Sequence, residues 1–126
     1  MSGNSKKIVY IIDDDRSVCE SLSMLMHSAD LDVEVFDLAE EFLQCKPRNE
    51  NSCLISDIKM KGIDGFDLQK ELVKKGFNIP MIFLTASDSK VSRIKAKKNG
   101  AVGYLSKPVD DQALLDIIHW TLSEDS

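Results

Sequence analysis

The chain has 126 residues, of which 43% are hydrophobic and 29% charged, which is the size and composition of one ordinary globular domain. We therefore expect a single domain over residues 1–126, with residues 1–6 as a flexible N-terminal tail. The formal net charge of −5 argues against non-specific binding to nucleic acid or to anionic membrane surfaces, because both require a basic face, and only a local basic patch could reverse this.

The first apolar run, Ile8 to Ile12, predicts a strand that is covered on both faces. It is too short to be a membrane span or the hydrophobic part of a signal peptide. A helix should follow with Asp15 or Ser17 as its N-cap, because apolar residues recur at helical spacing at Val18, Leu22, Leu25 and Ala29. We expect its neighbouring apolar residues to fill the core as well, namely Met24, Leu25 and Met26.

The same alternation of strand and helix continues to the end of the chain. Apolar runs predict strands at residues 33–36, 53–58, 81–85 and 101–105, and helical periodicity predicts helices at residues 38–43, 65–74, 89–99 and 110–122. Five strands alternating with five helices predict the α/β class, with a doubly wound five-stranded parallel sheet. Right-handed crossovers then place helices on both faces of the sheet.

Polar residues follow the predicted strands at the point where each strand ends. Asp13 and Asp14 end the first strand, Asp57 the third, Thr85 the fourth and Lys107 the fifth. In a doubly wound sheet the ligand site lies beyond the carboxyl ends of the strands, where the strand order reverses. The sequence therefore predicts one crevice that contains carboxylates, a hydroxyl group and an ammonium group.

This set of side chains favours metal-assisted phosphoryl chemistry. Clustered carboxylates are hard oxygen donors that suit Mg²⁺ or Mn²⁺ rather than zinc. With a metal in place, Asp57 can act as a nucleophile toward phosphorus. Lys107 can offset the charge that develops on the transferred group, and Thr85 can donate a hydrogen bond to it. A bare nucleotide phosphate would be repelled by Asp13 and Asp14.

Four segments together resemble the receiver domain of bacterial two-component response regulators along essentially the whole chain. In order and spacing they match the family: IIDDD, SDIKM with a glycine eight residues past Asp57, FLTAS and GYLSKP. The resemblance implies a flavodoxin-like receiver fold of five βα units. It also implies that the domain is a phosphoacceptor switch and no enzyme in the usual sense, catalysing at most its own phosphotransfer and slow dephosphorylation.

The resemblance assigns roles to the residues of the crevice. It implies Asp57 as the phosphoacceptor, Asp13 and Asp14 as the acid pocket, and Lys107 as the ion partner of the aspartates and of the phosphate. It further implies a Mg²⁺ site formed by Asp14, Asp57 and the backbone carbonyl of Lys59, with Asp13 contributing through water.

The resemblance also implies a switch outside the crevice. Thr85 and Tyr104 should form the switch pair, and Lys59 and Ser87 occupy the positions that tune the lifetime of the phosphate. The peptide bond before Pro108 should be cis. We expect Lys59, a lysine so close to the phosphoryl group, to slow dephosphorylation.

The implied partners are those of a signalling protein. A sensor histidine kinase should donate the phosphoryl group to Asp57, and the face formed by the fourth helix, fifth strand and fifth helix should control a downstream effector or output domain. A phosphorylation-dependent dimer is a further implication. We expect neither membrane association nor direct nucleic-acid binding by this domain.

A phosphatase of the haloacid-dehalogenase type is the alternative. In that interpretation Asp13 is the nucleophile and Asp15 the general acid, with Lys107 and Asp110 or Asp111 completing the site. Lys107 and the last acidic pair are too close together for this family. The alternative also leaves Asp57 without a role and has no segment to build a substrate pocket.

The remaining chemistry-bearing residues give weaker signals. The three cysteines are widely spaced, which predicts neither disulfides nor a zinc site and fits a reducing cytoplasm. We expect His27 and His119 at the surface. The position of Trp120 stays open, and the basic run of the fourth helix is either a solvated face or a docking face: Arg93, Lys95, Lys97 and Lys98.

Overall fold

The computed structural model describes residues 7–123, which form five strands and five helices in strict alternation. The expected tail at residues 1–6 lies outside the described residues. The strands are β1 (Ile8–Ile12), β2 (Asp32–Phe36), β3 (Ser52–Asp57), β4 (Met81–Thr85) and β5 (Gly103–Ser106). The helices are α1 (Arg16–Ser28), α2 (Ala39–Gln44), α3 (Gly65–Lys74), α4 (Lys90–Lys98) and α5 (Asp111–Leu122).

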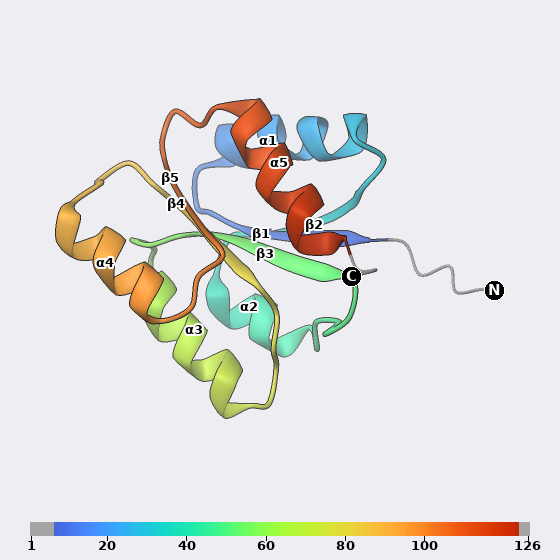
Figure 1. Cartoon of the computed structure of the whole chain (residues 1–126). Coiled ribbons are helices and arrows are strands. Elements are labelled where there is room, and N and C mark those ends of the chain that lie inside the picture. Colours follow the sequence, from blue (N-terminus) through green and yellow to red (C-terminus); the bar gives the residue numbers. More distant parts are fainter. Residues whose placement is uncertain (1–6, 124–126) are drawn as a thin grey trace.

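All strand pairs are parallel, and the strands lie in the order β2-β1-β3-β4-β5. Figure 1 shows α1 and α5 on one face of the sheet and α2, α3 and α4 on the other. This confirms the doubly wound five-stranded sheet. The strand order reverses between β1 and β3, and this reversal is where such folds place their ligands.

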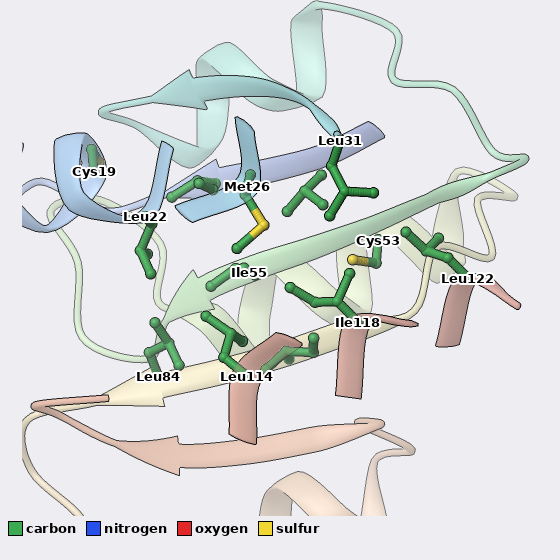
Figure 2. Close-up of a cluster of buried hydrophobic side chains, with 13 residues drawn as sticks. Cys19, Leu22, Met26, Leu31, Cys53, Ile55, Leu84, Leu114, Ile118 and Leu122 are labelled. Carbon is green, nitrogen blue, oxygen red and sulfur yellow. The ribbon is translucent and has the colours of Figure 1, made fainter. Parts of the chain in front are cut away.

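Each face of the sheet has its own hydrophobic core. The core under α1 and α5 is shown in Figure 2, where buried side chains from both helices and from the connection after α1 meet those of β3 and β4: Cys19, Leu22, Met26, Leu31, Cys53, Ile55, Leu84, Leu114, Ile118 and Leu122. The opposite core includes four aromatic residues, Tyr10, Phe42, Phe66 and Phe83. Because both faces are buried, the central strands are continuously apolar.

Four of the five helices begin at a capping side chain. The Asp15 carboxylate accepts hydrogen bonds from the backbone amides of Ser17 and Val18, which decides in favour of Asp15 as the N-cap of α1. The other capping side chains are those of Asp64 for α3, Ser89 for α4 and Asp110 for α5. Such caps satisfy amide groups that have no partner inside the helix.

The predicted limits of the elements are wrong by one or two residues in several places. The fifth strand was expected from Ala101 but begins at Gly103, because the Ala101 amide donates to the carbonyl of Ala96 and ends α4 instead. The third strand ends at Asp57, because the next carbonyl, that of Ile58, accepts the amide of Gly65 at 2.7 Å.

One core prediction is also wrong. Met24 is 73% exposed, whereas Met26 is fully buried and Leu25 is partly buried. Met24 and Met26 are two residues apart and so point to different sides of the helix. His27 and His119 are exposed as expected, and Trp120, left open by the sequence, is exposed. Within residues 7–123 no helix is both long and apolar enough to cross a membrane.

Candidate functional site

The ends of β1 and β3 bring two carboxylates together at the point where the strand order reverses. Ile12 is paired with Ser56 in the parallel register, so the residues that follow, Asp13 and Asp57, lie side by side. Asp13 is only 2% exposed, and Asp57 is partly buried. Two carboxylates in such positions need a positive partner, because burial of an unpaired charge is costly.

Lys107 is that partner. Its Nζ donates hydrogen bonds to Asp13 Oδ2 at 2.7 Å and to Asp57 Oδ2 at 2.9 Å. The backbone amide of Lys107 donates to the carbonyl of Thr85 at 2.8 Å, which holds the lysine at the end of β5. The Lys107–Pro108 peptide bond is cis, as expected. Burial lowers the pKa of the ammonium group, but its hydrogen bonds to the two aspartates outweigh this and raise it.

The second oxygen of each carboxylate is held by the backbone. Asp13 Oδ1 accepts the amide of Asp15 at 2.9 Å, and Asp57 Oδ1 accepts the amide of Lys59 at 3.3 Å. The Cys19 thiol donates to the backbone carbonyl of Asp13 at 3.3 Å. Burial, and next the Asp13 carboxylate, raise the pKa of Cys19 to about 11, so this thiol is protonated at neutral pH.

The other two aspartates of the triplet are exposed, and neither is hydrogen-bonded to Lys107 among residues 7–123. Asp14 is exposed at the edge of the crevice. Asp15 is occupied as a helix cap, and its pKa is lowered first by the hydrogen bond from the Ser17 hydroxyl and then by that from the Val18 amide. An ionised cap that already accepts these hydrogen bonds is a poor general acid, which weakens the phosphatase alternative.

Thr85 lies at the end of β4, next to Asp57. It is buried, and its Oγ1 accepts the backbone amide of Ser87 at 3.0 Å. Tyr104 of β5 packs against the aromatic core, and its hydroxyl is buried without a hydrogen-bond partner among residues 7–123. Burial, and next the nearby Asp88, raise the pKa of this phenol. The expected switch pair therefore spans two adjacent strands, β4 and β5.

The donor set of the crevice fits Mg²⁺. By residue type Asp13, Asp14 and Asp57 are hard oxygen donors, and the backbone carbonyl of Lys59 is the further donor that the resemblance implies. Among residues 7–123 no group of three acidic, histidine or cysteine side chains is already arranged around a metal position. Mg²⁺ typically keeps several waters and uses one or two carboxylates, so a small set of hard donors is sufficient.

Sequence reasoning missed a cluster next to Tyr104. The carboxylate of Asp88 accepts hydrogen bonds from the Arg93 guanidinium and the Ser106 hydroxyl, and Arg93 also lies over the Tyr104 ring. Arg93 was named from the sequence only as part of the basic run of the fourth helix, and Asp88 was not named. Ser106 comes from a different strand, so no spacing along the chain could have indicated the contact.

These features define a class of protein: a flavodoxin-like α/β domain with an acidic pocket and a lysine at the carboxyl edge of its sheet. The family described as the response regulator receiver domain matches residues 9–119. The chain belongs to this family, whose members are phosphorylation-activated switches of two-component systems. The match gives no support to the haloacid-dehalogenase alternative.

Several relatives are similar over nearly the whole chain. Nodulation protein W of Bradyrhizobium diazoefficiens is 40% identical over 115 residues, which cover 91% of this chain and 51% of that protein. The transcriptional regulatory protein TdiR of Thauera aromatica is 36% identical over 122 residues, covering 97% of this chain and 53% of that protein. The chain thus spans about half the length of the curated relatives it matches.

Solved structures agree with the fold. The response regulator StyR superposes with a TM-score of 0.85 at 41% identity, over 94% of this chain and 60% of that chain. The structure named FixJ-N superposes with a TM-score of 0.84 at 28% identity, over 95% of this chain and 96% of that chain.

Proposed function

We propose that this domain accepts a phosphoryl group on Asp57 from the phosphohistidine of a sensor kinase and then acts as a signalling switch. One observation carries the proposal: Lys107 Nζ bridges Asp13 and Asp57 where the strand order reverses. A lysine anchored there by two carboxylates is positioned to compensate the negative charge of a phosphoryl group on Asp57.

In the transfer step a carboxylate oxygen of Asp57 forms a bond to phosphorus, and the bond between phosphorus and the donor imidazole breaks. Phosphorylation adds negative charge and acceptor oxygens beside Asp57, and the Lys107 ammonium can rotate to pair with them. Mg²⁺ held by Asp14, Asp57 and the Lys59 carbonyl, with Asp13 acting through water, would neutralise charge on the phosphoryl oxygens. Mn²⁺ would supply the same chemistry.

The switch follows from the new acceptor oxygens. The hydroxyl oxygen of Thr85 accepts the Ser87 amide, so its proton is free to be donated to them, and a movement of Thr85 toward the phosphoryl group leaves space in which Tyr104 can change its position. Such a change is a population shift between two packed states, biased by a covalent group. Lys59 and Ser87 border the phosphoryl position and are proposed to tune its lifetime.

The proposed output surface is formed by α4, β5 and α5. It adjoins Tyr104 and has exposed apolar side chains, with Val91 and Trp120 each 76% exposed. A partner domain that buries such side chains would respond to the switch. We propose that this surface contacts an effector or output domain, or a second phosphorylated copy, and that the domain works in the cytoplasm. The three cysteines are free, which supports a reducing compartment.

The test is to find which carboxylate carries the phosphoryl group. The chain is incubated with acetyl phosphate and Mg²⁺, the acyl phosphate is reduced with borohydride, and the modified residue is mapped by mass spectrometry. We expect the label on Asp57, none in Asp57→Asn and normal labelling in Asp15→Asn. Label on Asp13, or loss of labelling in Asp15→Asn, would favour the phosphatase mechanism instead.

A further inference from the structure

A charged cluster outside the crevice links three elements next to the proposed switch. Asp88 lies in the connection between β4 and α4, and its Oδ2 accepts hydrogen bonds from the Arg93 guanidinium and from Ser106 Oγ, the latter at 3.1 Å. Arg93 belongs to α4, and Ser106 is the last residue of β5. One carboxylate therefore holds the connection against both a helix and the edge strand. We call these three residues the latch.

The latch also encloses Tyr104. The guanidinium carbon of Arg93 lies 5.7 Å from the centre of the tyrosine ring, within the range of a cation–π contact. Partial burial opposes ionisation of Asp88. The hydrogen bonds that its carboxylate accepts, among them those from Arg93 and Ser106, outweigh this and lower the pKa of the carboxyl group. Asp88 is therefore ionised at neutral pH, and the two charges that hold the connection also hold the ring.

The position of the latch along the chain gives it a consequence for Thr85. Asp88 follows Thr85 by three residues, and between them the Ser87 amide donates to Thr85 Oγ1 at 3.0 Å. This bond links Thr85 to the short connection that contains Ser87 and Asp88, so a movement of Thr85 toward a phosphoryl group displaces the connection. The displacement moves Asp88, whose carboxylate is hydrogen-bonded to Arg93 of α4 and Ser106 of β5.

We propose that the Asp88–Arg93–Ser106 latch stabilises the unphosphorylated conformation and so sets how readily the domain switches. The inference rests on the proposed function, since it concerns the state that phosphorylation of Asp57 must displace. Asp88 and Arg93 are positioning residues: they act through the β4–α4 connection and Tyr104 and do not touch the phosphoryl group.

The exposure of the pair limits the size of the effect. The Arg93 side chain is 62% exposed and that of Asp88 30% exposed, so solvent screens their attraction. Ion pairs at such positions change an equilibrium by about twofold to fivefold. Opening the latch should therefore raise the affinity for beryllofluoride, a phosphoryl mimic, by about twofold to fivefold.

The experiment measures beryllofluoride affinity at Asp57 in the presence of Mg²⁺ by ¹⁹F NMR of the chain labelled with fluorotyrosine. The chain has two tyrosines, and Tyr104→Phe assigns the two signals. Asp88→Asn, Arg93→Ala and the double variant are compared with the unmodified chain. Because both residues belong to one latch, the effects of the two substitutions on affinity should not add up in the double variant. Lys97→Ala is the matched control, since it removes an exposed positive charge from α4 one turn further on.

We expect tighter binding in both single variants, no further gain in the double variant, an altered Tyr104 signal without ligand, and unchanged affinity in Lys97→Ala. The latch alone would be overturned if the unmodified chain binds beryllofluoride normally and Asp88→Asn and Arg93→Ala bind it equally well or more weakly. It would also be overturned if the gains in affinity of the two single variants add up in the double variant. Absence of beryllofluoride binding in the unmodified chain would overturn the latch together with the proposed function.

Discussion

At the scale of single residues, three consecutive aspartates differ in environment and therefore in role. Asp13 is buried and paired with Lys107, Asp14 is exposed at the edge of the crevice, and Asp15 caps α1. Their identical side chains would repel one another if they faced the same way. The backbone resolves this, because β1 ends at Ile12 and the chain turns into the helix within three residues.

The first prediction separates the metal ligand from the cap. Asp14→Asn should weaken Mg²⁺ binding severely, because it removes a charged oxygen donor. Asp15→Asn should leave Mg²⁺ affinity nearly unchanged, since asparagine caps helices about as well as aspartate. Isothermal titration with Mg²⁺ checks both variants. Equal losses in the two would contradict the assignment.

The second prediction concerns the ion pair network. Lys107→Met should lower the free energy of unfolding by about 2–3 kcal/mol at pH 7 without Mg²⁺, because it leaves adjacent carboxylates without a counter-charge. The pKa of Lys107 is raised above its ordinary value of 10.5, so its stabilising contribution is complete below that pH and is lost as the pH rises through the higher folded-state value. Urea titrations at pH 7, 9 and 11 measure the free energy of unfolding of Lys107→Met and of the unmodified chain. The difference between the two should be the same at pH 7 and 9 and smaller at pH 11. A difference that grows at pH 11 would refute this.

The third prediction tests Lys59. Its side chain is exposed and its amide holds Asp57 Oδ1, so replacement should remove the charge without moving the aspartate. If the ammonium group attracts the phosphoryl oxygens or hinders water, Lys59→Ala should shorten the acyl-phosphate lifetime by about twofold to fivefold. Release of radiolabelled phosphate measures this lifetime, and Lys74→Ala, an exposed change at the end of α3, is the control. An unchanged lifetime would exclude the tuning role.

At the scale of elements, the start of α3 is packed directly against β3, the strand that ends at the proposed phosphoacceptor Asp57. A Cβ atom on Gly65 would lie 2.7 Å from the Asp57 carbonyl oxygen and 2.9 Å from the Phe83 ring. Phe83 in turn packs against Phe66, with ring centres 5.0 Å apart and the ring planes tilted by 54°. The glycine is therefore required by close approach, and a larger residue must push α3 away from Asp57.

The fourth prediction follows from that contact. Gly65→Ala should cost about 1–3 kcal/mol of stability and should also slow phosphorylation of Asp57, because the clash involves its backbone. Gly76→Ala is the control: it introduces strain at φ +86°, with no atom within 4 Å of the new Cβ, far from the crevice. Thermal unfolding and labelling by acetyl phosphate are measured for both. Slowed labelling in Gly76→Ala as well would show a general effect of destabilisation.

At the scale of the whole molecule, negative charge is concentrated at the carboxyl edge of the sheet. The chain carries a formal charge of −5, and the carboxylates of Asp13 and Asp57 are paired with Lys107 at that edge. A cation that binds only the folded state must then stabilise it by mass action. Binding of Mg²⁺ in this crevice would therefore stabilise the entire fold.

The fifth prediction measures this coupling. Mg²⁺ should raise the thermal midpoint, with a gain of about 2.7 kcal/mol at a hundredfold excess over its Kd. Sodium chloride at the same ionic strength is the control for general screening, and Asp14→Asn should abolish most of the specific gain. An equal rise with sodium chloride would mean that no specific site exists.

Local patterns alone were enough to predict the alternation of strands and helices and the residues at the strand ends. A strand buried on both faces must be continuously apolar, as Ile8–Ile12 is, and the carboxyl ends of parallel strands must meet at one edge. It could therefore be predicted from the sequence alone that one crevice contains Asp13, Asp57, Thr85 and Lys107. The resemblance added Tyr104 and the cis bond before Pro108.

Other features depended on contacts between distant segments, which no local pattern encodes. The core prediction treated Met24 and Met26 alike, although Met26 follows Leu22 by four residues and shares its buried face, whereas Met24 does not. The latch joins Asp88, in the connection between β4 and α4, to Ser106 of β5, which lies eighteen positions further along the chain. The sequence by itself determined the fold class and the chemistry at the strand ends, since these follow from backbone periodicity and residue type. Only the tertiary structure decided which charges pair and which apolar faces stay exposed, because these depend on the register and packing of segments far apart in the chain.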